Sequence, residues 1–242
     1  MRTVITQRDV PRSSKLGEDP EEYGYPEGYQ ALPLITQIEL LQKRFPNLKT
    51  FDITLFISIS KGNVPDGAEG WFAIPRWRAI ASTYVGAVGK VLDMIEGDRD
   101  NGFYNSIECK LDARHFRQTR KSAKFFARIA REQEHKDILF IPAQFGSDYV
   151  DLPVRWAREK MGVGEFALGL FAVATMTLVH PQRFVTCNDL WIACSGDEYA
   201  SSGDGFNSVP VLGIGRHNRL RLGVRWGGDG KPDCGIPTGF SS

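Results

Sequence analysis

The sequence has no apolar run long enough to cross a lipid bilayer. Its longest such run is FALGLFAVATMTLV, residues 166–179, whereas a transmembrane helix needs about 20 predominantly apolar residues. We therefore expect no membrane span, and a run of this kind is typical of a helix that is buried on all sides. Net charge is also nearly absent, since 30 Lys and Arg residues against 29 Asp and Glu residues give +1. Attraction to an acidic partner would have to arise from a local cluster of charges.

Cysteine and histidine are scarce, with 4 residues of each type. No two cysteines and no two histidines stand two to four residues apart, which is the spacing that most zinc sites use. We therefore expect no metal site from the candidate soft ligands, which are His180, Cys187, Cys194 and Cys234. The beginning of the chain lacks an apolar segment of the signal-peptide kind, so we expect a reducing, cytoplasmic setting for these thiols.

Motifs that bind nucleotides or calcium are missing as well. The chain has neither a G-x-x-x-x-G-K-[ST] loop nor a G-x-G-x-x-G turn that opens a helix. The acidic stretch GDEYASSGDG contains Asp197, Glu198 and Asp204, but it lacks the alternate acids and the closing Glu of an EF-hand loop. We interpret it as a solvated turn, and we expect no cofactor.

The composition predicts a folded globular protein. Hydrophobic residues make up 42% and charged residues 24% of the 242 residues, which excludes a chain that is disordered throughout. Residues 1–31 have almost no periodic apolar pattern, and we interpret them as a flexible N-terminal arm whose tyrosines are candidates for docking. Residues 32–242 are expected to form a single globular α+β or mixed α/β domain, with helices packed on a mixed sheet.

The periodicity of apolar residues predicts the individual elements. Repeats of three and four predict helices, and short runs of branched and aromatic residues predict strands. The predicted helices are ALPLITQIELLQKRF (31–45), 76–96, 112–134, a short helix from 153 to about 162, and 165–179. The predicted strands are 51–60, 137–142 and, in a strand-rich C-terminal third, RFVTC, DLWIAC, VPVLGIG and RLRLGVRW. Arginines alternate with apolar residues in RLRLGVRW, which indicates a half-buried strand.

One combination of residues resembles a nucleophilic site. Cys194 could act as a nucleophile with His180 and Asp189 as partners, as in cysteine hydrolases. No local signature surrounds the cysteine, and the alternative is that Cys194 is a small hydrophobic residue at the end of a core strand. We favour that alternative, with Trp191 buried in the strand DLWIAC, and with Asp197 and Glu198 as candidates for ion pairs with arginines of RLRLGVRW.

The most distinctive feature is a row of cations in the predicted helix 112–134. The cations follow one another at intervals of three and four, which places them on a single face of a helix: Arg114, Arg117, Lys121, Lys124, Arg128 and Arg131. No acid occurs between residues 113 and 131, so salt bridges within the helix cannot neutralise the row before Glu132. Like charges at this spacing repel, and the row therefore needs a partner or a covering group.

The row predicts a non-catalytic protein that binds nucleic acid or another polyanion through phosphate contacts. No helix-turn-helix, zinc finger or RNA-recognition motif accompanies it, so this prediction is electrostatic. Two alternatives stay open. One is an assembly or interaction protein without catalysis; independently of the function, the row could be solvated or covered by acids from residues 93–100 or 197–204. The other is a small hydrolase that uses Cys194.

Overall fold

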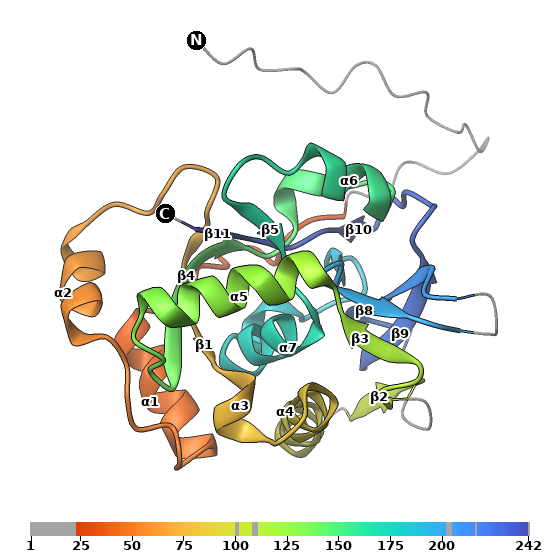
Figure 1. Ribbon diagram of the computed structural model, residues 1–242. Helices are drawn as coiled ribbons and strands as arrows, with labels where there is room; N and C mark the ends of the chain where they lie inside the picture. The colour runs from red at the N-terminus through yellow and green to blue at the C-terminus, as the bar shows by residue number, and fades with distance from the viewer. Residues whose placement is uncertain (1–22, 100–101, 108–110, 202–204, 216, 242) are drawn as a thin grey trace, which may run out of the picture.

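The computed structural model describes residues 23–99, 102–107, 111–201, 205–215 and 217–241, and these form a single α+β domain with two sheets (Figure 1). The α-helices are α1 (Leu34–Arg44), α2 (Ile53–Lys61), α3 (Trp77–Ile80), α4 (Tyr84–Asp98), α5 (Arg120–Glu132), α6 (Val154–Lys160) and α7 (Leu170–Val179). The strands are β1 (Gly70–Pro75), β2 (Phe103–Asn105), β3 (Phe116–Gln118), β4 (Ile138–Gln144), β5 (Glu165–Ala167), β6 (Trp191–Ala193), β7 (Asp197–Tyr199), β8 (Ser208–Ile214), β9 (Leu220–Trp226), β10 (Cys234–Gly235) and β11 (Thr238–Phe240). The predicted fold class and the strand-rich C-terminal third are confirmed.

The smaller sheet is antiparallel, in the order β1-β4-β11-β5, and it supports much of the core. Every residue of its central strand β4 is buried. Helices α1 and α7 contact β1, while α5 contacts β5. The ring of Phe125 on α5 stacks on Phe166 of β5 at 4.8 Å between centroids, so α5 is fixed to this sheet through its apolar face.

The larger sheet is mixed and is built around β8. One edge of β8 pairs with β9 along its whole length, and the other edge pairs with β6 and β7 in succession. The parallel pairs β2–β9 and β10–β6 extend it, and β3 pairs antiparallel with β7. Leu220 and Leu222 of β9 are buried while Arg221 is exposed, so the predicted half-buried strand is confirmed there. Trp226, at the end of the same apolar series, is 54% exposed.

Helix α7 is the centre of the core, as its sequence predicts. All of its residues are buried, and it packs against α4 and β1 (Figure 1). The helix is shorter than predicted because residues 165–167 form β5, which is paired with β11. The residue before the helix, Gly169, has no side chain that could cap it. The backbone N–H of the first residue, Leu170, is instead accepted by the carboxylate of Asp197, on the distant strand β7.

Two predicted elements near the N-terminus are wrong. The predicted strand 51–60 is mostly helix α2, because Asp52 accepts a hydrogen bond from the backbone N–H of Leu55 and so caps a helix. The predicted helix 76–96 is divided into α3 and α4, because the Thr83 hydroxyl caps a new helix at Gly86 N–H. Pro75 is the last residue of β1, a strand that the sequence did not predict.

The predicted helix 112–134 is wrong over its first turns. The Asp112 carboxylate accepts hydrogen bonds from the N–H groups of Arg114 and His115, which makes a turn. Residues 116–118 then form β3 and pair with β7, and the helix begins only at Arg120. Tertiary pairing with β7 therefore overrides the local helical pattern. The predicted strand RFVTC is wrong too, because Pro181–Arg183 form a 3-10 turn and no strand follows before β6.

Part of the predicted N-terminal arm lies against the domain. Residues 1–22 lie outside the described residues. Gly24 pairs with Asp189, and the Tyr25 hydroxyl bonds to the Glu69 carboxylate. The guanidinium of Arg183, which is fully buried, lies 4.0 Å from the centre of the Tyr25 ring. A cation–π contact thus attaches the segment at Tyr25 to the core.

Close approach of two loops predicts the effect of a single methyl group at Gly196. A Cβ at this position would lie 2.4 Å from Gly169 N and 2.5 Å from the carbonyl carbon of Leu168. We expect Gly196→Ala to lower the free energy of unfolding by at least about 1–3 kcal/mol, as overpacking does. Gly89→Ala is the matched control, because a Cβ there meets nothing within 4 Å and the residue is inside α4. Urea denaturation should show Gly89→Ala to be about 0.5–1 kcal/mol more stable than the native protein. Equal stabilities of Gly196→Ala and Gly89→Ala would contradict the packing described.

Candidate polyanion-binding surface

The exposed face of α5 carries a cluster of cations, which we call the α5 cationic face. Its members are Arg120, Lys121, Lys124, Arg128 and Arg131, and all five side chains are exposed. The helix begins where the Thr119 hydroxyl accepts a hydrogen bond from Ser122 N–H. Ser122, Ile129 and Ala130 are buried on the opposite side, so the amphipathic pattern of this segment determines which side faces outward.

Four of the six cations in the predicted row belong to this face, and two do not. Arg114 is exposed in the turn after Asp112. Arg117 lies on β3, where its guanidinium pairs with Glu198 at 2.8 Å and covers the ring of Phe206 at 3.8 Å. The row is therefore divided, because a strand side chain and a helix side chain at this spacing do not share a face. Arg120 joins the face instead, at the first position of the helix.

Little of the α5 cationic face is neutralised by the part of the chain that the structure describes. Arg128 pairs with Glu132 at 2.7 Å. Among the described residues, no ion pair involves Arg120, Lys121, Lys124 or Arg131. The expected cover by acids of 197–204 occurs at one position, where Glu198 pairs with Arg117. Asp204 lies outside the described residues.

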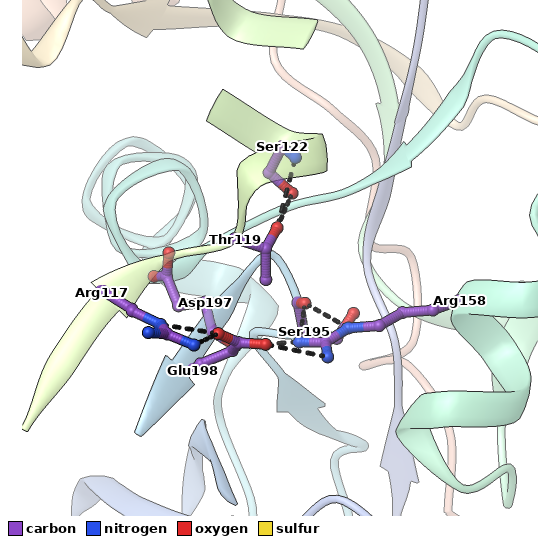
Figure 2. A network of polar contacts seen from close by, with 7 residues as sticks. All are labelled: Arg117, Thr119, Ser122, Arg158, Ser195, Asp197 and Glu198. Atoms are coloured by element: carbon purple, nitrogen blue, oxygen red, sulfur yellow. Dashed lines mark hydrogen bonds and ion pairs between the residues drawn. The ribbon is translucent and has the colours of Figure 1, made fainter. Parts of the chain in front are cut away.

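A polar network anchors the start of α5 to the core (Figure 2). Thr119 N–H donates to the Gly196 carbonyl at 2.9 Å, and the Ser122 hydroxyl donates to the Ala167 carbonyl at 2.7 Å. The Arg158 guanidinium donates to the carbonyls of Ser195 and Asp197 and lies 3.8 Å from the Glu198 carboxylate. The β6–β7 turn is therefore held on both sides, by α5 and by α6.

The carboxyl group of Asp197 is the buried centre of this region, and the predicted solvated turn is wrong there. Asp197 is 0% exposed on β7. Its Oδ2 accepts Leu170 N–H at 2.5 Å, and its Oδ1 accepts the Tyr84 hydroxyl at 2.9 Å. Burial raises the pKa of Asp197 to about 7, against the lowering effect of these hydrogen bonds. Glu198 pairs with Arg117 and Arg158 rather than with the arginines of β9.

The predicted nucleophilic residues do not form a catalytic arrangement. Cys194 is completely buried, and burial raises the pKa of its thiol. His180 Nδ1 donates to the Met176 carbonyl, and its Nε2 accepts Leu32 N–H at 3.0 Å, so both ring nitrogens are engaged. Asp189 accepts hydrogen bonds from Val185 N–H and Thr186 N–H. Each side chain therefore holds the local backbone, and this geometry gives the hydrolase alternative no support.

The candidate metal ligands do not form a metal-binding cluster in the part of the chain that the structure describes. Within the described ranges, no three His, Cys, Asp or Glu residues are grouped as a metal ion would need. Cys187 is exposed, whereas Cys194 and Cys234 are buried, and all three are free thiols. Cys109 lies outside the described residues.

No helix in the described parts of the chain is long and apolar enough to cross a membrane.

A second surface, which sequence reasoning did not assign, is a pocket of about 1010 Å³ on the outer side of β8 and β9. The indole of Trp191, predicted to be buried, is only partly so and lies over Gly213, where a Cβ would be 2.4 Å from the ring. The Arg221 guanidinium lies 5.4 Å from the Tyr104 ring, and Arg225 pairs with Asp233 at 3.0 Å. We call this the sheet-face pocket. The alternating arginines of RLRLGVRW were its signal in the sequence, but the rings of Tyr104 and Trp191 come from β2 and β6.

The unusual pKa of Asp197 predicts a specific dependence of stability on pH. Its pKa is raised in the folded state, so the stability it contributes is present at pH 4 and is lost as the pH rises through about 7. The Asp197→Asn variant would keep an acceptor for Leu170 N–H without titrating. The free energy of unfolding of the native protein minus that of Asp197→Asn should fall by about 1.4 kcal/mol per pH unit over this range, on the order of 4 kcal/mol in all.

Denaturation by urea between pH 4 and pH 8 measures this difference. His180, whose pKa is lowered to about 4 by burial, titrates in both proteins and cancels in the comparison. A difference in unfolding free energy that stays constant with pH would show that Asp197 is not a buried acid of raised pKa.

Comparison with known proteins identifies no relative. No protein family matches the chain, no curated protein is significantly similar to it in sequence, and no solved structure is significantly similar to it. The function must therefore be argued from the two surfaces.

Proposed function

We propose that the protein binds nucleic acid, without catalysis, by holding phosphate groups on the α5 cationic face. The observation that carries this proposal is the set of five exposed cations on one helix face, of which only Arg128 has an acidic partner among the described residues. The 13 residues of α5 span about 20 Å. A polyanion with closely spaced phosphates matches such a row better than a single small anion does.

The physical cost of the row supports this proposal. Like charges at helical spacing repel by a few tenths of a kcal/mol per pair. Arg120 and Lys121 also lie at the positive end of the helix dipole, where cations are disfavoured. An anion lying on this face would relieve both effects, and it would also meet the positive potential of the helix N-terminus.

The sheet-face pocket supports single strands as the preferred form of nucleic acid. Unpaired bases stack on aromatic rings and on guanidinium planes, and duplex bases cannot. The pocket offers the rings of Tyr104 and Trp191 beside Arg219, Arg221 and Arg225, with Asp233 as its one lining acid among the described residues. The three cysteines that the structure describes are free thiols, which is compatible with the reducing, cytoplasmic setting that we propose for this activity.

A protein partner is the second candidate function. An acidic protein surface would also complement the α5 cationic face, and its binding would require no nucleic acid. The salt dependence of binding separates the two candidates, because phosphate contacts release condensed counterions.

Neutralising part of the α5 cationic face should weaken nucleic-acid binding without affecting the fold. We expect the triple variant Arg120→Gln, Lys121→Gln, Lys124→Gln to bind a mixed-sequence oligonucleotide more weakly at low salt. The slope of log affinity against log salt should fall by about 2 on single strands, at about 0.7 for each lost phosphate contact. Fluorescence anisotropy of a labelled oligonucleotide measures both quantities.

The matched control removes the same charge elsewhere. Lys43, Lys49 and Lys61 are exposed and belong to other segments than α5, namely α1, the loop after it and the end of α2. The corresponding triple Gln variant should keep most of the affinity and of the slope. If both triple variants lose affinity equally, binding depends on total charge and the proposed surface is wrong.

Removing an aromatic ring from the sheet-face pocket should weaken binding of single strands in particular. Tyr104 is 53% exposed, so Tyr104→Ala should fold normally. Loss of one stacked base costs about 1–3 kcal/mol, or about 5- to 150-fold in affinity for a single strand, with a smaller effect on a duplex. Trp226→Ala is the control, because Trp226 is 54% exposed but does not line the pocket. Equal losses in the two variants would remove the pocket from the proposal.

A further inference from the structure

A second cavity, of about 450 Å³, lies beside the buried side of α5. Its walls come from the end of β1, from α3, α4 and α5, and from the first residues of α7, which lie close together in Figure 1. Its volume is within the range of about 300–1,000 Å³ that is typical of small-molecule sites. We call it the α5 cavity.

The inner wall of the α5 cavity is apolar. The rings of Trp77, Tyr84, Phe126 and Phe171 line it, and Trp77 and Tyr84 meet edge to face at 6.1 Å. Three alanines of α5 also line it, at positions 123, 127 and 130. Because these side chains are short, α5 does not fill the space between itself and α3. An apolar group that entered the cavity would be removed from water, which is favourable in proportion to its buried area.

The charged residues that line the α5 cavity are all basic or histidine. They are Arg76, Arg78, Arg131 and His135, and no Asp or Glu lines the cavity among the described residues. The Arg78 guanidinium lies 4.0 Å from the centre of the Trp77 ring, at the boundary between the apolar and the charged parts. Arg76 is held by the Lys136 carbonyl and lies 3.8 Å from Asp137, so Arg78 and Arg131 retain the most uncompensated charge.

We propose that the α5 cavity binds a small amphipathic carboxylate, with its hydrocarbon part against the rings and its carboxylate at Arg78 and Arg131. The combination of an apolar wall with arginines alone as fixed charges selects this class, because the arginine fork matches a carboxylate and an apolar body fills the wall. This ligand is distinct from the nucleic acid of the proposed function. The two sites share one residue, Arg131, which belongs to the α5 cationic face and also lines the cavity.

Isothermal titration with decanoate, below its micelle concentration, tests the proposal on the full chain. Decanoate should bind in a one-to-one complex and change the fluorescence of Trp77. Decylamine should not bind, and decanol should bind at least tenfold more weakly than decanoate. Octanoate should bind more than tenfold more weakly than decanoate, at about fourfold for each methylene lost from the cavity. Absence of decanoate binding, or equal affinity for decylamine, would overturn the proposal.

Variants separate this site from the nucleic-acid surface. Ala127 is exposed at the side of the cavity, so Ala127→Phe should fold, fill the space and weaken decanoate binding more than tenfold. Ala127→Ser, which leaves the space open, should bind within about twofold of the native protein. Arg78→Gln should weaken decanoate binding but not decanol binding. Lys121→Gln with Lys124→Gln should weaken oligonucleotide binding and leave decanoate binding unchanged.

The outcomes distinguish the two proposals from one another. Loss of decanoate binding in the Lys121 and Lys124 variant, with no loss in Ala127→Phe, would place the anion on the helix surface and overturn the cavity site. Decanoate binding that follows the cavity variants while no variant affects oligonucleotides would support the cavity and contradict only the proposed function.

Discussion

The contact of the Asp197 carboxylate with the N-terminus of α7 is the constraint on which the rest of the structure depends. Helix α7 is buried over its whole length and begins after a glycine that provides no side-chain cap. An uncapped helix N-terminus in the core would leave N–H groups without water or partner, at a cost of about 1–3 kcal/mol each. Asp197, on β7 of the larger sheet, provides the acceptor for the N-terminus of α7. Because α7 packs on the smaller sheet, we expect the two sheets to fold together.

The same contact places the surface that we propose to be functional. Thr119, the cap of α5, donates to the Gly196 carbonyl in the turn before Asp197. Gly196 in turn lies against Gly169, where α7 begins. The cations of α5 are therefore carried by a helix whose N-cap residue is attached to the turn before the buried Asp197. Such an attachment gives a charged face a fixed orientation, which a loop would not.

The helices and strands that depend on short-range patterns could be predicted from the sequence. Those whose conformation depends on contacts with distant residues could not. The continuous apolar run of α7 and the amphipathic pattern of 120–132 were sufficient to predict helices. Residues 112–118 have the same local pattern, but pairing of Arg117 with Glu198 makes them a turn and a strand. Nothing in the stretch SGDEY indicated that Asp197 would be buried and that Glu198 would pair with arginines. The α5 cationic face was thus predicted in part, since four of its five cations were identified from their spacing. The sheet-face pocket and the α5 cavity were not predicted.

Lysine footprinting with bound oligonucleotide tests the central claim most directly. Acetylation of the protein with and without a single-stranded oligonucleotide, followed by mass spectrometry, reports which ammonium groups the ligand covers. The α5 cationic face predicts strong protection of Lys121 and Lys124, and unchanged reactivity of Lys43, Lys49 and Lys61, which are exposed elsewhere. Uniform reactivity at all five lysines, or protection that avoids α5, would contradict the account.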